Sequence, residues 1–527
     1  MFKVLVADPI SELGLQKLYE HPDIQVDIQT GLPEAEIIAI IDQYDALLVR
    51  SQTKVTASII QAGKKLRVIG RAGVGVDNID VPAATKAGII VMNAPDGNTI
   101  STAELTFAMI MASARKIPQA HQKLKNGTWD RKSFVGVELR NKVLGIIGFG
   151  RIGTEVAKRA QAFGMKVMAY DPFMTPEKAE EVGVQAASVN EIVEAADFIT
   201  VHTPLTKDTK HMISTPQFAK MKRGVRIINC ARGGIIDEAA LFEAIQNGIV
   251  ANAALDVYEQ EPPTDSPLVG LEQVVVTPHL GASTEEAQIN VAIDVAEELV
   301  NVLTEQPFKN AVNLPSLPQE VLKSVQPYLE LGEKLGLLLA QRIRGRVQSI
   351  KCSYAGDLSK ISVSPITRTL LKGILSYHYG EEVNYINAPL FAEEQKIQTS
   401  EIKSGKHKVF TNLIHVEVTT DEQVYSVAGT LFNGLGPKIV SLDGFTIDAN
   451  PTGTMLITEH TDTPGIIGQV GTILGTSDIN IGSMQVGRKE EGGLAVMVLG
   501  IDKPISVELL HLLRNIRGIH SVSEVNL

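Results

Sequence analysis

The chain has 527 residues, of which 44% are apolar and 21% charged, and its formal net charge is −11. This composition predicts several soluble globular domains and argues against a nucleic-acid partner, because surfaces that bind nucleic acid are usually basic. The sequence contains neither an apolar run of about 18 residues nor a signal-peptide pattern, so we expect neither a membrane span nor export. Its only two cysteines, Cys230 and Cys352, favour neither a disulfide framework nor a metal site, which suggests a reducing cytoplasm.

Short apolar runs alternate with amphipathic stretches along the first hundred residues. We expect strands at residues 3–7, 46–49, 68–70 and 89–92, with helices around 11–19, 34–42 and 57–62. Strands that alternate with helices predict a doubly wound parallel sheet, which is an α/β fold. A single long helix from 101 to about 124 is expected to follow.

A second alternating series then begins. It predicts strands at residues 143–147, 166–170, 198–201, 225–229, 253–256 and 274–277, and a helix from about 283 to 303. Pro315 and Pro318 bracket a short linker, and residues 451–453 mark a second break. The stretch between these breaks mixes helical and strand patterns without a chemical motif, whereas residues 454–525 follow the ferredoxin-like order βαββαβ.

The central motif of the second series is Gly148-Phe149-Gly150-Arg151-Ile152-Gly153. A G-x-G-x-x-G pattern alone is weak evidence, since an ordinary glycine turn would explain it. Here an apolar strand precedes it, a helix opens within it, and the next strand ends in Asp171, about 20 residues further on. This context predicts that a dinucleotide pyrophosphate binds at the helix N-terminus. Asp171 would bind the ribose hydroxyls and repel a 2′-phosphate, so we expect NAD rather than NADP.

Three further segments carry reactive residues at the ends of predicted strands. Arg232 lies in Asn229-Cys230-Ala231-Arg232-Gly233-Gly234, Glu261 follows the strand that ends at Asp256, and His279 follows Pro278. Reduction of a 2-oxo acid needs a cation for the carboxylate, an acid for the developing alkoxide and a carboxylate that orients that acid. Arg232, His279 and Glu261 fit these roles. Each residue alone would more often be structural, and Cys230 is interpreted as a small pocket-lining residue rather than a nucleophile.

Taken together, these motifs resemble the D-isomer-specific 2-hydroxyacid dehydrogenase family, and in particular its long-form phosphoglycerate dehydrogenases. The resemblance covers essentially the whole chain. It implies a substrate-binding domain made of residues 1–98 and 284–313, an inserted NAD-binding Rossmann domain of 99–283, an α+β intervening domain of 316–450 and an ACT regulatory domain of 453–527. The substrate-binding domain would be flavodoxin-like, with a cleft between it and the NAD-binding domain.

The resemblance also assigns residues by position. Arg232, Glu261 and His279 would be catalytic. The cofactor-binding residues would be Gly148, Gly150, Arg151, Ile152, Gly153, Asp171, Thr203, Cys230, Ala231, Asp256 and Gly281. The substrate-binding residues would be Arg50, Ser51, Arg71, Gly73, Val74 and Asn98. Read physically, the two arginines offer cations, and the backbone N–H groups of Gly73 and Val74 are expected to be free, as in an oxyanion or phosphate site.

The C-terminal segment resembles an ACT domain, a small amino-acid-sensing module. Position matching puts effector-binding groups at His460, Asp462 and Asn480, and the effector implied is L-serine. The alternative is that the module serves only in oligomerisation. The family implies a homotetramer, and the Trp129-Asp130-Arg131 loop resembles its dimer-crossing element.

The function implied is NAD-dependent oxidation of D-3-phosphoglycerate to 3-phosphohydroxypyruvate, the first step toward L-serine. One alternative is a glyoxylate or hydroxypyruvate reductase of the same family, against which Arg50 and Arg71 argue. The other is a non-catalytic NAD-sensing corepressor, against which the net negative charge argues. We expect no metal, no nucleic acid and no membrane among its partners.

Overall fold

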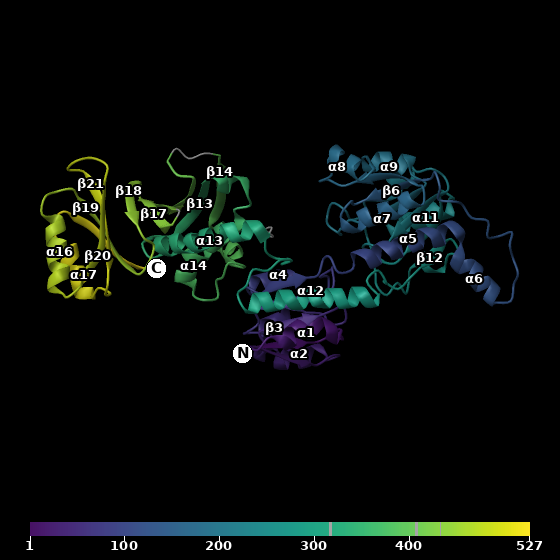
Figure 1. Cartoon of the computed structure of the whole chain (residues 1–527), viewed down its shortest axis with the longest axis horizontal. Coiled ribbons are helices and arrows are strands. Elements are labelled where there is room, and N and C mark those ends of the chain that lie inside the picture. The colour runs from purple at the N-terminus through teal and green to yellow at the C-terminus, as the bar shows by residue number, and fades with distance from the viewer. Residues whose placement is uncertain (316–318, 406–408, 433) are drawn as a thin grey trace.

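The computed structural model describes residues 1–315, 319–405, 409–432 and 434–527. Figure 1 shows four units, which we call the first to the fourth in chain order. Their strands are β1–β5, β6–β12, β13–β18 and β19–β22. Part of the predicted linker, including Pro318, lies outside the described residues. Among the described helices, none is long and apolar enough to cross a membrane.

The first unit is a parallel sheet of order β2-β1-β3-β4-β5. Its strands are β1 (Phe2–Val6), β2 (Ile24–Ile28), β3 (Ala46–Val49), β4 (Val68–Arg71) and β5 (Ile90–Asn93). Its helices are α1 (Glu12–Glu20), α2 (Glu34–Ile40), α3 (Ala57–Ala62) and α4 (Val81–Lys86). The order matches the flavodoxin-like type of doubly wound sheet.

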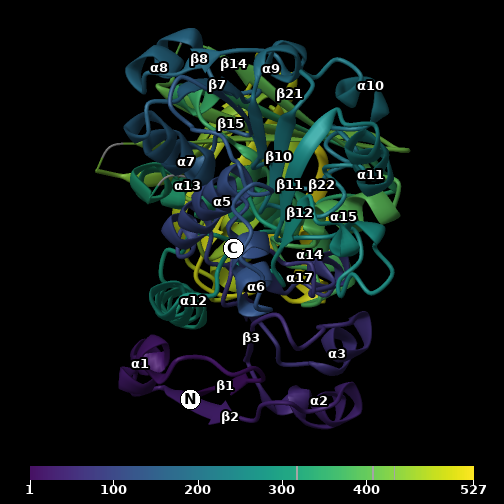
Figure 2. The ribbon, with the colours of Figure 1, turned by 90° about the vertical axis from the view of Figure 1, so that its right-hand side faces the viewer.

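A helix from much later in the chain completes this unit. Helix α12 (Glu285–Leu303) packs beside α1, as Figure 2 shows, and its Val295 and Leu299 belong to the same apolar core as Val4 and Leu48. The two helices touch so closely that a Cβ atom on Gly14 would lie 2.1 Å from that of Ala292. The chain therefore leaves the first unit after β5 and returns to it through α12.

The second unit is a seven-stranded parallel sheet of order β12-β11-β10-β9-β6-β7-β8. Its strands are β6 (Val143–Ile147), β7 (Lys166–Tyr170), β8 (Gln185–Ala186), β9 (Phe198–Val201), β10 (Val225–Asn229), β11 (Val250–Leu255) and β12 (Val274–Val276). Its helices are α5 (Thr99–Arg115), α6 (Ile117–Lys125), α7 (Arg151–Ala162), α8 (Pro176–Glu181), α9 (Val189–Ala195), α10 (Thr215–Phe218) and α11 (Glu238–Gln246). The strand order reverses at β6, and this is the point where such sheets bind ligands.

The predicted single helix over residues 101–124 is wrong. The chain breaks it between α5 and α6 at Lys116, whose φ is 54°. Pro118 explains the break, because its ring would clash with the carbonyl of the preceding turn and it has no N–H to donate. As a result α6 points away from the sheet, toward the edge of the molecule (Figure 1).

The third unit is a mixed six-stranded sheet of order β14-β13-β15-β16-β17-β18. Its strands are β13 (Val347–Gly356), β14 (Gln398–Ser404), β15 (Asn412–Thr420), β16 (Val424–Phe432), β17 (Gly436–Leu442) and β18 (Phe445–Ala449). Its helices are α13 (Gln319–Ala340), α14 (Ser364–Tyr379) and α15 (Ala388–Glu394). Fold-class predictions for all four units are confirmed.

The fourth unit has the predicted βαββαβ order and an antiparallel sheet β20-β21-β19-β22. Its elements are β19 (Thr454–Thr461), α16 (Ile466–Thr476), β20 (Ile481–Arg488), β21 (Leu494–Ile501), α17 (Val507–Arg514) and β22 (Ile519–Asn526). One apolar core runs from the third unit into the fourth and includes Phe445 and Ile447 together with Ile457 and Val498. The two units are therefore packed as one body.

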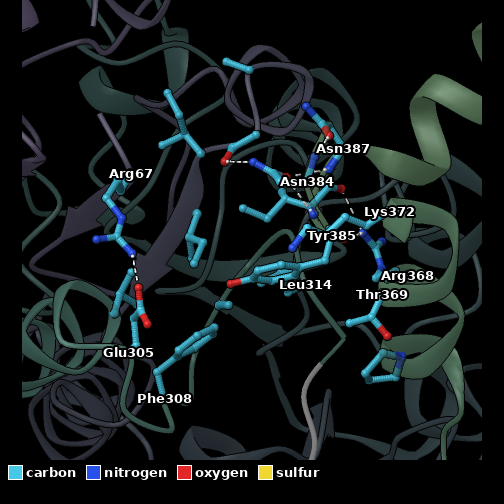
Figure 3. Close-up of a pocket in the computed structure, with 18 of the residues that line it drawn as sticks. Arg67, Glu305, Phe308, Leu314, Arg368, Thr369, Lys372, Asn384, Tyr385 and Asn387 are labelled. Atoms are coloured by element: carbon cyan, nitrogen blue, oxygen red, sulfur yellow. Dashed lines mark hydrogen bonds and ion pairs between the residues drawn. The ribbon is translucent and has the colours of Figure 1, made fainter. Parts of the chain in front are cut away.

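The third unit touches the first through both polar and apolar contacts beside a large cavity. Asn384 Nδ2 donates to the Gly88 carbonyl at 2.9 Å, and Asn387 Nδ2 donates to the Lys86 carbonyl at 3.3 Å. The cavity holds about 1450 Å³, and Figure 3 shows part of its lining. Charges of both signs line it, including the paired Lys372 and Glu333. Ile386 of the third unit belongs to the same apolar core as Val4 and Leu48, and Tyr385 packs against that core. The seam is thus partly polar, partly apolar and incompletely packed, unlike the continuous core between the third and fourth units.

Candidate active site

The three motif glycines have three different surroundings. Gly148 has a φ of 99°, and a Cβ atom there would lie 2.5 Å from the backbone of His202, so only glycine fits this turn. A Cβ on Gly153 would meet the Gly148 carbonyl oxygen at 2.4 Å. Gly150, by contrast, is exposed and faces open space just before α7. The backbone at the start of α7 is therefore accessible to a phosphate group.

Other groups beside this turn fit a dinucleotide. Asp171 directly follows β7, and its carboxylate accepts the Phe149 N–H at 3.0 Å and the Phe173 N–H at 2.9 Å, which leaves lone pairs for ribose hydroxyls. In the described chain, Thr203 Oγ1 and Asn98 Oδ1 are buried without a hydrogen-bond partner. Such buried polar atoms need a partner, which a bound cofactor would supply. Arg151 instead forms an ion pair with Asp96, at 2.5 Å.

His279 and Glu261 form a pair, as the sequence analysis expects. His279 Nδ1 lies 2.8 Å from Glu261 Oε2. This hydrogen bond, together with the Glu261 charge, raises the pKa of His279 even though burial opposes the shift. Burial alone would raise the pKa of Glu261, but the hydrogen bond and charge of His279 outweigh it and the pKa is lowered. The imidazole is therefore oriented through Nδ1, and Nε2 remains for a reacting group.

Asp256 holds the loop that carries His279. It is fully buried, and its carboxylate accepts hydrogen bonds from Thr277 Oγ1 at 2.6 Å, from Leu280 N at 2.7 Å and from Gly281 N at 2.9 Å. The bonded residues lie on both sides of His279 in the chain. The backbone φ of His279 is 56°, which is in the left-handed region that residues other than glycine rarely adopt. The geometry supports a positioning role for Asp256, and a remaining lone pair could still reach the predicted cofactor.

Arg232 lies in a loop whose backbone is held by the side chain of Asn229. Asn229 Nδ2 donates to the Arg232 carbonyl at 2.9 Å, and its Oδ1 accepts the Ala231 N–H at 3.0 Å. The Arg232 charge lowers the pKa values of both Glu261 and His279, so the guanidinium is near that pair. The predicted trio is thus brought together from the ends of β10, β11 and β12.

The first unit contributes two more arginines at strand ends. Arg71 Nε donates to Asn78 Oδ1 at 3.1 Å, and Asn78 Nδ2 in turn donates to the Arg50 carbonyl at 2.7 Å. Burial lowers the pKa of Arg71, and the charges of Arg232 and Arg50 lower it further. An ideal Cβ atom on Gly73 would lie 2.3 Å from Arg71 Nη1, and one on Gly75 would lie 2.3 Å from Arg232 Nη2, so these two guanidinium groups from two units lie against the same loop. Arg50 Nη1 donates to the Pro9 carbonyl at 3.4 Å. Such a set of cations suits a ligand with two anionic groups.

The expectation that Gly73 offers a free N–H is wrong. Its N–H donates to the Arg71 carbonyl at 2.8 Å, because the chain turns tightly there. In the described chain the N–H of Val74 makes no such bond, and the Val74 carbonyl accepts from Asn93 Nδ2 at 2.5 Å. Ser51 is exposed. Of the two donors that the sequence predicts, Gly73 and Val74, only the Val74 N–H has no hydrogen-bond partner among the described residues.

The two thiols are buried and not paired with each other. Burial and the nearby Asp256 charge raise the pKa of Cys230 to about 12, so the thiolate nucleophile is not available at neutral pH. This agrees with the interpretation of Cys230 as a pocket-lining residue. Among the described residues, no group of three or more His, Cys, Asp or Glu side chains could hold a metal ion.

The three predicted effector residues do not meet within one chain. His460 is buried near the end of β19, and Asp462 just beyond it is paired with Arg488 at the end of β20, at 3.0 Å. Asn480 precedes the start of β20, at the opposite end of the sheet. An eight-residue strand separates Asn480 from Arg488, roughly 26 Å at about 3.3 Å per residue.

Several residues around the site were given no role from the sequence. Asp8 accepts the backbone N–H groups of Arg50 and Thr53, at 2.6 and 3.1 Å, and so shapes the Arg50 loop. Asp77 forms an ion pair with Arg232 at 3.5 Å. Asp77 and Asn78 lie a few residues beyond the predicted substrate-binding residues Gly73 and Val74, but only the folded chain shows what they contact.

Three parts of the chain match known protein families. Residues 107–281 match the model of the NAD-binding domain of D-isomer specific 2-hydroxyacid dehydrogenases, 324–443 match the D-3-phosphoglycerate dehydrogenase intervening domain, and 454–518 match the ACT domain. A crystal structure of D-lactate dehydrogenase from Aquifex aeolicus, complexed with NAD and lactic acid, aligns with a TM-score of 0.52 and 29% identity over 60% of this chain and 100% of that one. Fold and site define an NAD-dependent 2-hydroxyacid dehydrogenase.

Full-length relatives narrow the class further. The chain is 48% identical over 527 residues to D-3-phosphoglycerate dehydrogenase of Bacillus subtilis, with 100% of both chains covered. It is 46% identical over 528 residues to the enzyme of the same name from Methanocaldococcus jannaschii, again with 100% of both covered. The chain belongs to the D-3-phosphoglycerate dehydrogenase family. The predictions of an NAD-dependent oxidoreductase, an intervening domain and an ACT domain are confirmed.

Proposed function

We propose that the chain binds D-3-phosphoglycerate between its first two units and oxidises it to 3-phosphohydroxypyruvate with NAD, the first step toward L-serine. The observation that carries this proposal is that Arg71 and Arg232 lie against the same loop, while His279 is paired with Glu261. Arg50 directly follows the neighbouring strand β3. Arg232 would hold the substrate carboxylate with its planar fork. Arg50 and Arg71, together with the Val74 N–H, would hold the phosphate.

The protein's own part in the chemistry is a proton transfer. His279 Nε2 takes the proton of the substrate 2-hydroxyl as the carbon loses its hydride, and bound NAD supplies the hydride acceptor. The resulting imidazolium is stabilised by the Glu261 carboxylate at Nδ1. In the reverse direction the same imidazolium protonates the alkoxide. Asp256 keeps the His279 loop in place throughout.

Replacing Glu261 by Gln should change the pH dependence. Glu261 raises the pKa of His279, so the E261Q variant should have a lower His279 pKa. Oxidation needs neutral His279, and its rise with pH should therefore occur at lower pH in E261Q. Reduction needs the protonated form, and its loss as pH rises should also occur at lower pH. We also expect kcat to fall roughly tenfold to a hundredfold, as for a lost hydrogen bond to a charged group.

The measurement is kcat/KM against pH in both directions, for wild type and E261Q. Unchanged profiles in both directions would show that Glu261 does not control the titration of His279.

The substrate is tested by mixing the enzyme with NAD and either 3-phosphoglycerate or glycerate and following the absorbance of the reduced cofactor. Turnover of 3-phosphoglycerate with a much lower kcat/KM for glycerate supports the proposal. Turnover of glycerate alone would indicate a reductase of unphosphorylated acids instead. No turnover of any 2-hydroxy acid would indicate a protein that only binds NAD.

We further propose the domain division given by the family resemblance: 1–98 with 284–313 for substrate, 99–283 for NAD, 316–450 as intervening domain and 453–527 as ACT domain. The packing of α12 on α1 supports the split first domain. We also propose a cytoplasmic location, which suits two buried and unpaired thiols.

We propose that the chain forms a homotetramer with two kinds of contact. Trp129 is 79% exposed and Val135 76% exposed, in the loop after α6, as expected for side chains that a partner covers. At the far end of the chain, β20 is an edge strand, and β21 is the one described strand to which it is hydrogen-bonded. Such an edge offers unpaired backbone groups to a second copy.

Pairing at β20 would also complete an effector site for L-serine. If two β20 strands pair antiparallel about a two-fold axis, Asn480 of the partner subunit lies beside Arg488 and therefore near Asp462 and His460. This arrangement brings together the three effector residues that one chain keeps apart. Serine bound there would contact both subunits.

L-serine should therefore lower the rate of 3-phosphoglycerate oxidation, and Asn480→Ala should raise the serine concentration for half inhibition by about tenfold or more, the usual effect of losing a hydrogen bond to a charged ligand. Activity without serine is the reference for each variant. Asn450→Ala, outside the proposed site, is the matched control. Equal serine sensitivity in wild type and N480A would contradict the site, and a wild type insensitive to saturating serine would contradict the effector.

A further inference from the structure

The loop of residues 73–77 in the first unit lies against a catalytic side chain of the second. An ideal Cβ atom on Gly75 would be 2.3 Å from Arg232 Nη2 and 2.7 Å from Asp77 Oδ2. The guanidinium of Arg232 therefore rests directly on the backbone of this loop. A glycine at position 75 is what allows this approach.

Asp77 is the carboxylate that faces Arg232 across this contact. Its Oδ2 lies 3.5 Å from Arg232 Nε, and the Asp77 side chain is 81% exposed while that of Arg232 is 30% exposed. The charge of Asp77 also acts on Arg71, whose pKa it raises against the opposing effects of burial and Arg232. Asp77 is thus the counter-ion of Arg232, and its charge also favours the protonated form of Arg71.

The N–H donors of Arg232 differ in which groups they face. Its Nη1 already donates to the Ala231 carbonyl, at 2.7 Å. Nε and Nη2 form an edge that suits a two-point contact with a carboxylate, and this edge faces Asp77 and Gly75. A substrate carboxylate that binds Nε and Nη2 therefore competes with Asp77 for these donors.

We propose that Asp77 is a positioning residue that occupies the Nε–Nη2 edge of Arg232 before substrate binds and is displaced by the substrate carboxylate. The inference rests on the proposed role of Arg232. An exposed ion pair is weak, so Asp77 can be displaced readily, and its departure leaves Arg232 already aimed at the site. Asp77 thereby competes with substrate and lowers the affinity of the site for anions.

The test is Asp77→Asn, which keeps the size of the side chain and removes its charge. We expect the KM for 3-phosphoglycerate to fall about two- to fivefold, the range typical of exposed ion pairs. The kcat and the KM for NAD should change less than twofold, because the contact between Asp77 and Arg232 is already broken when substrate is bound, before hydride transfer. Asp77→Glu should restore the wild-type KM. Asp357→Asn, which removes an exposed pair with Lys360 in the third unit, should change neither constant.

An unchanged or higher KM for substrate in D77N would overturn the proposal, and a higher KM would indicate a merely structural loop residue. A second measurement separates this inference from the identity of the substrate. Oxalate, a small dicarboxylate, is titrated into the enzyme with bound NADH, and binding is followed by NADH fluorescence. Its Kd should fall two- to fivefold in D77N whichever 2-hydroxy acid the enzyme oxidises, and an equal or higher Kd would overturn the role of Asp77.

Discussion

Replacing His279 by Asn should lower kcat for 3-phosphoglycerate oxidation by two to four orders of magnitude, the usual contribution of a positioned acid–base group. The amide cannot take the hydroxyl proton, and the Glu261 carboxylate 2.8 Å from the former Nδ1 position then has no imidazolium to stabilise. NAD binding should be nearly unchanged, because the glycine turn and Asp171 lie on other strands. The measurements are steady-state kcat and NADH binding by fluorescence.

The matched control for His279 is His378→Asn, at an exposed position near the end of α14 in the third unit. That variant should keep wild-type kcat. If H279N retained more than a tenth of the wild-type kcat, His279 would not be the proton acceptor, and another group at the site would have to be sought.

The second large effect is expected for Arg232→Ala. Losing one partner of a hydrogen-bonded charge pair costs about 2–5 kcal/mol, which corresponds to a roughly 30- to 4000-fold fall in kcat/KM. Both kcat and KM should suffer, since Arg232 orients the carboxylate at the reacting carbon. Arg232→Lys should be intermediate, because lysine keeps the charge and loses the planar fork. The measurement is kcat/KM for both variants at saturating NAD.

Arg344→Ala, at an exposed position in the third unit, is the control for Arg232. A kcat/KM for R232A within threefold of wild type would remove Arg232 from the site. If R232K matched R232A, the charge itself would contribute nothing and the geometry of the guanidinium would be the whole effect. The two variants thus separate charge from shape.

The arrangement of the four units bears on regulation. The third and fourth units share one apolar core, whereas the third meets the first through Asn384, Asn387 and the apolar side chains of Tyr385 and Ile386, beside a large cavity. The segment of residues 384–387 is therefore the place where the third unit, with the ACT domain packed on it, contacts the substrate-binding unit.

Sequence patterns identified the elements whose signals are local. The strands of both parallel sheets are buried apolar runs, and the strand, glycine turn, helix and acid around Gly148 form one contiguous stretch. Strand β2 was missed because it is an edge strand with a partly exposed, alternating pattern. The break at Lys116 was missed because apolar periodicity continues through Pro118.

By itself, the sequence determined the class of fold and the cofactor, because alternating apolar runs and the glycine turn are local signals. It also predicted the proposed catalytic trio, from residue types at the ends of consecutive strands. Only the tertiary structure decided the pairing of Asp77 with Arg232, the anchoring of the His279 loop by Asp256 and the separation of Asn480 from Asp462. These facts depend on which loops from distant segments face each other and on the order of strands in a sheet. The spacing of residues along the chain reveals neither which loops face each other nor the order of the strands, because the packing of the folded chain sets both.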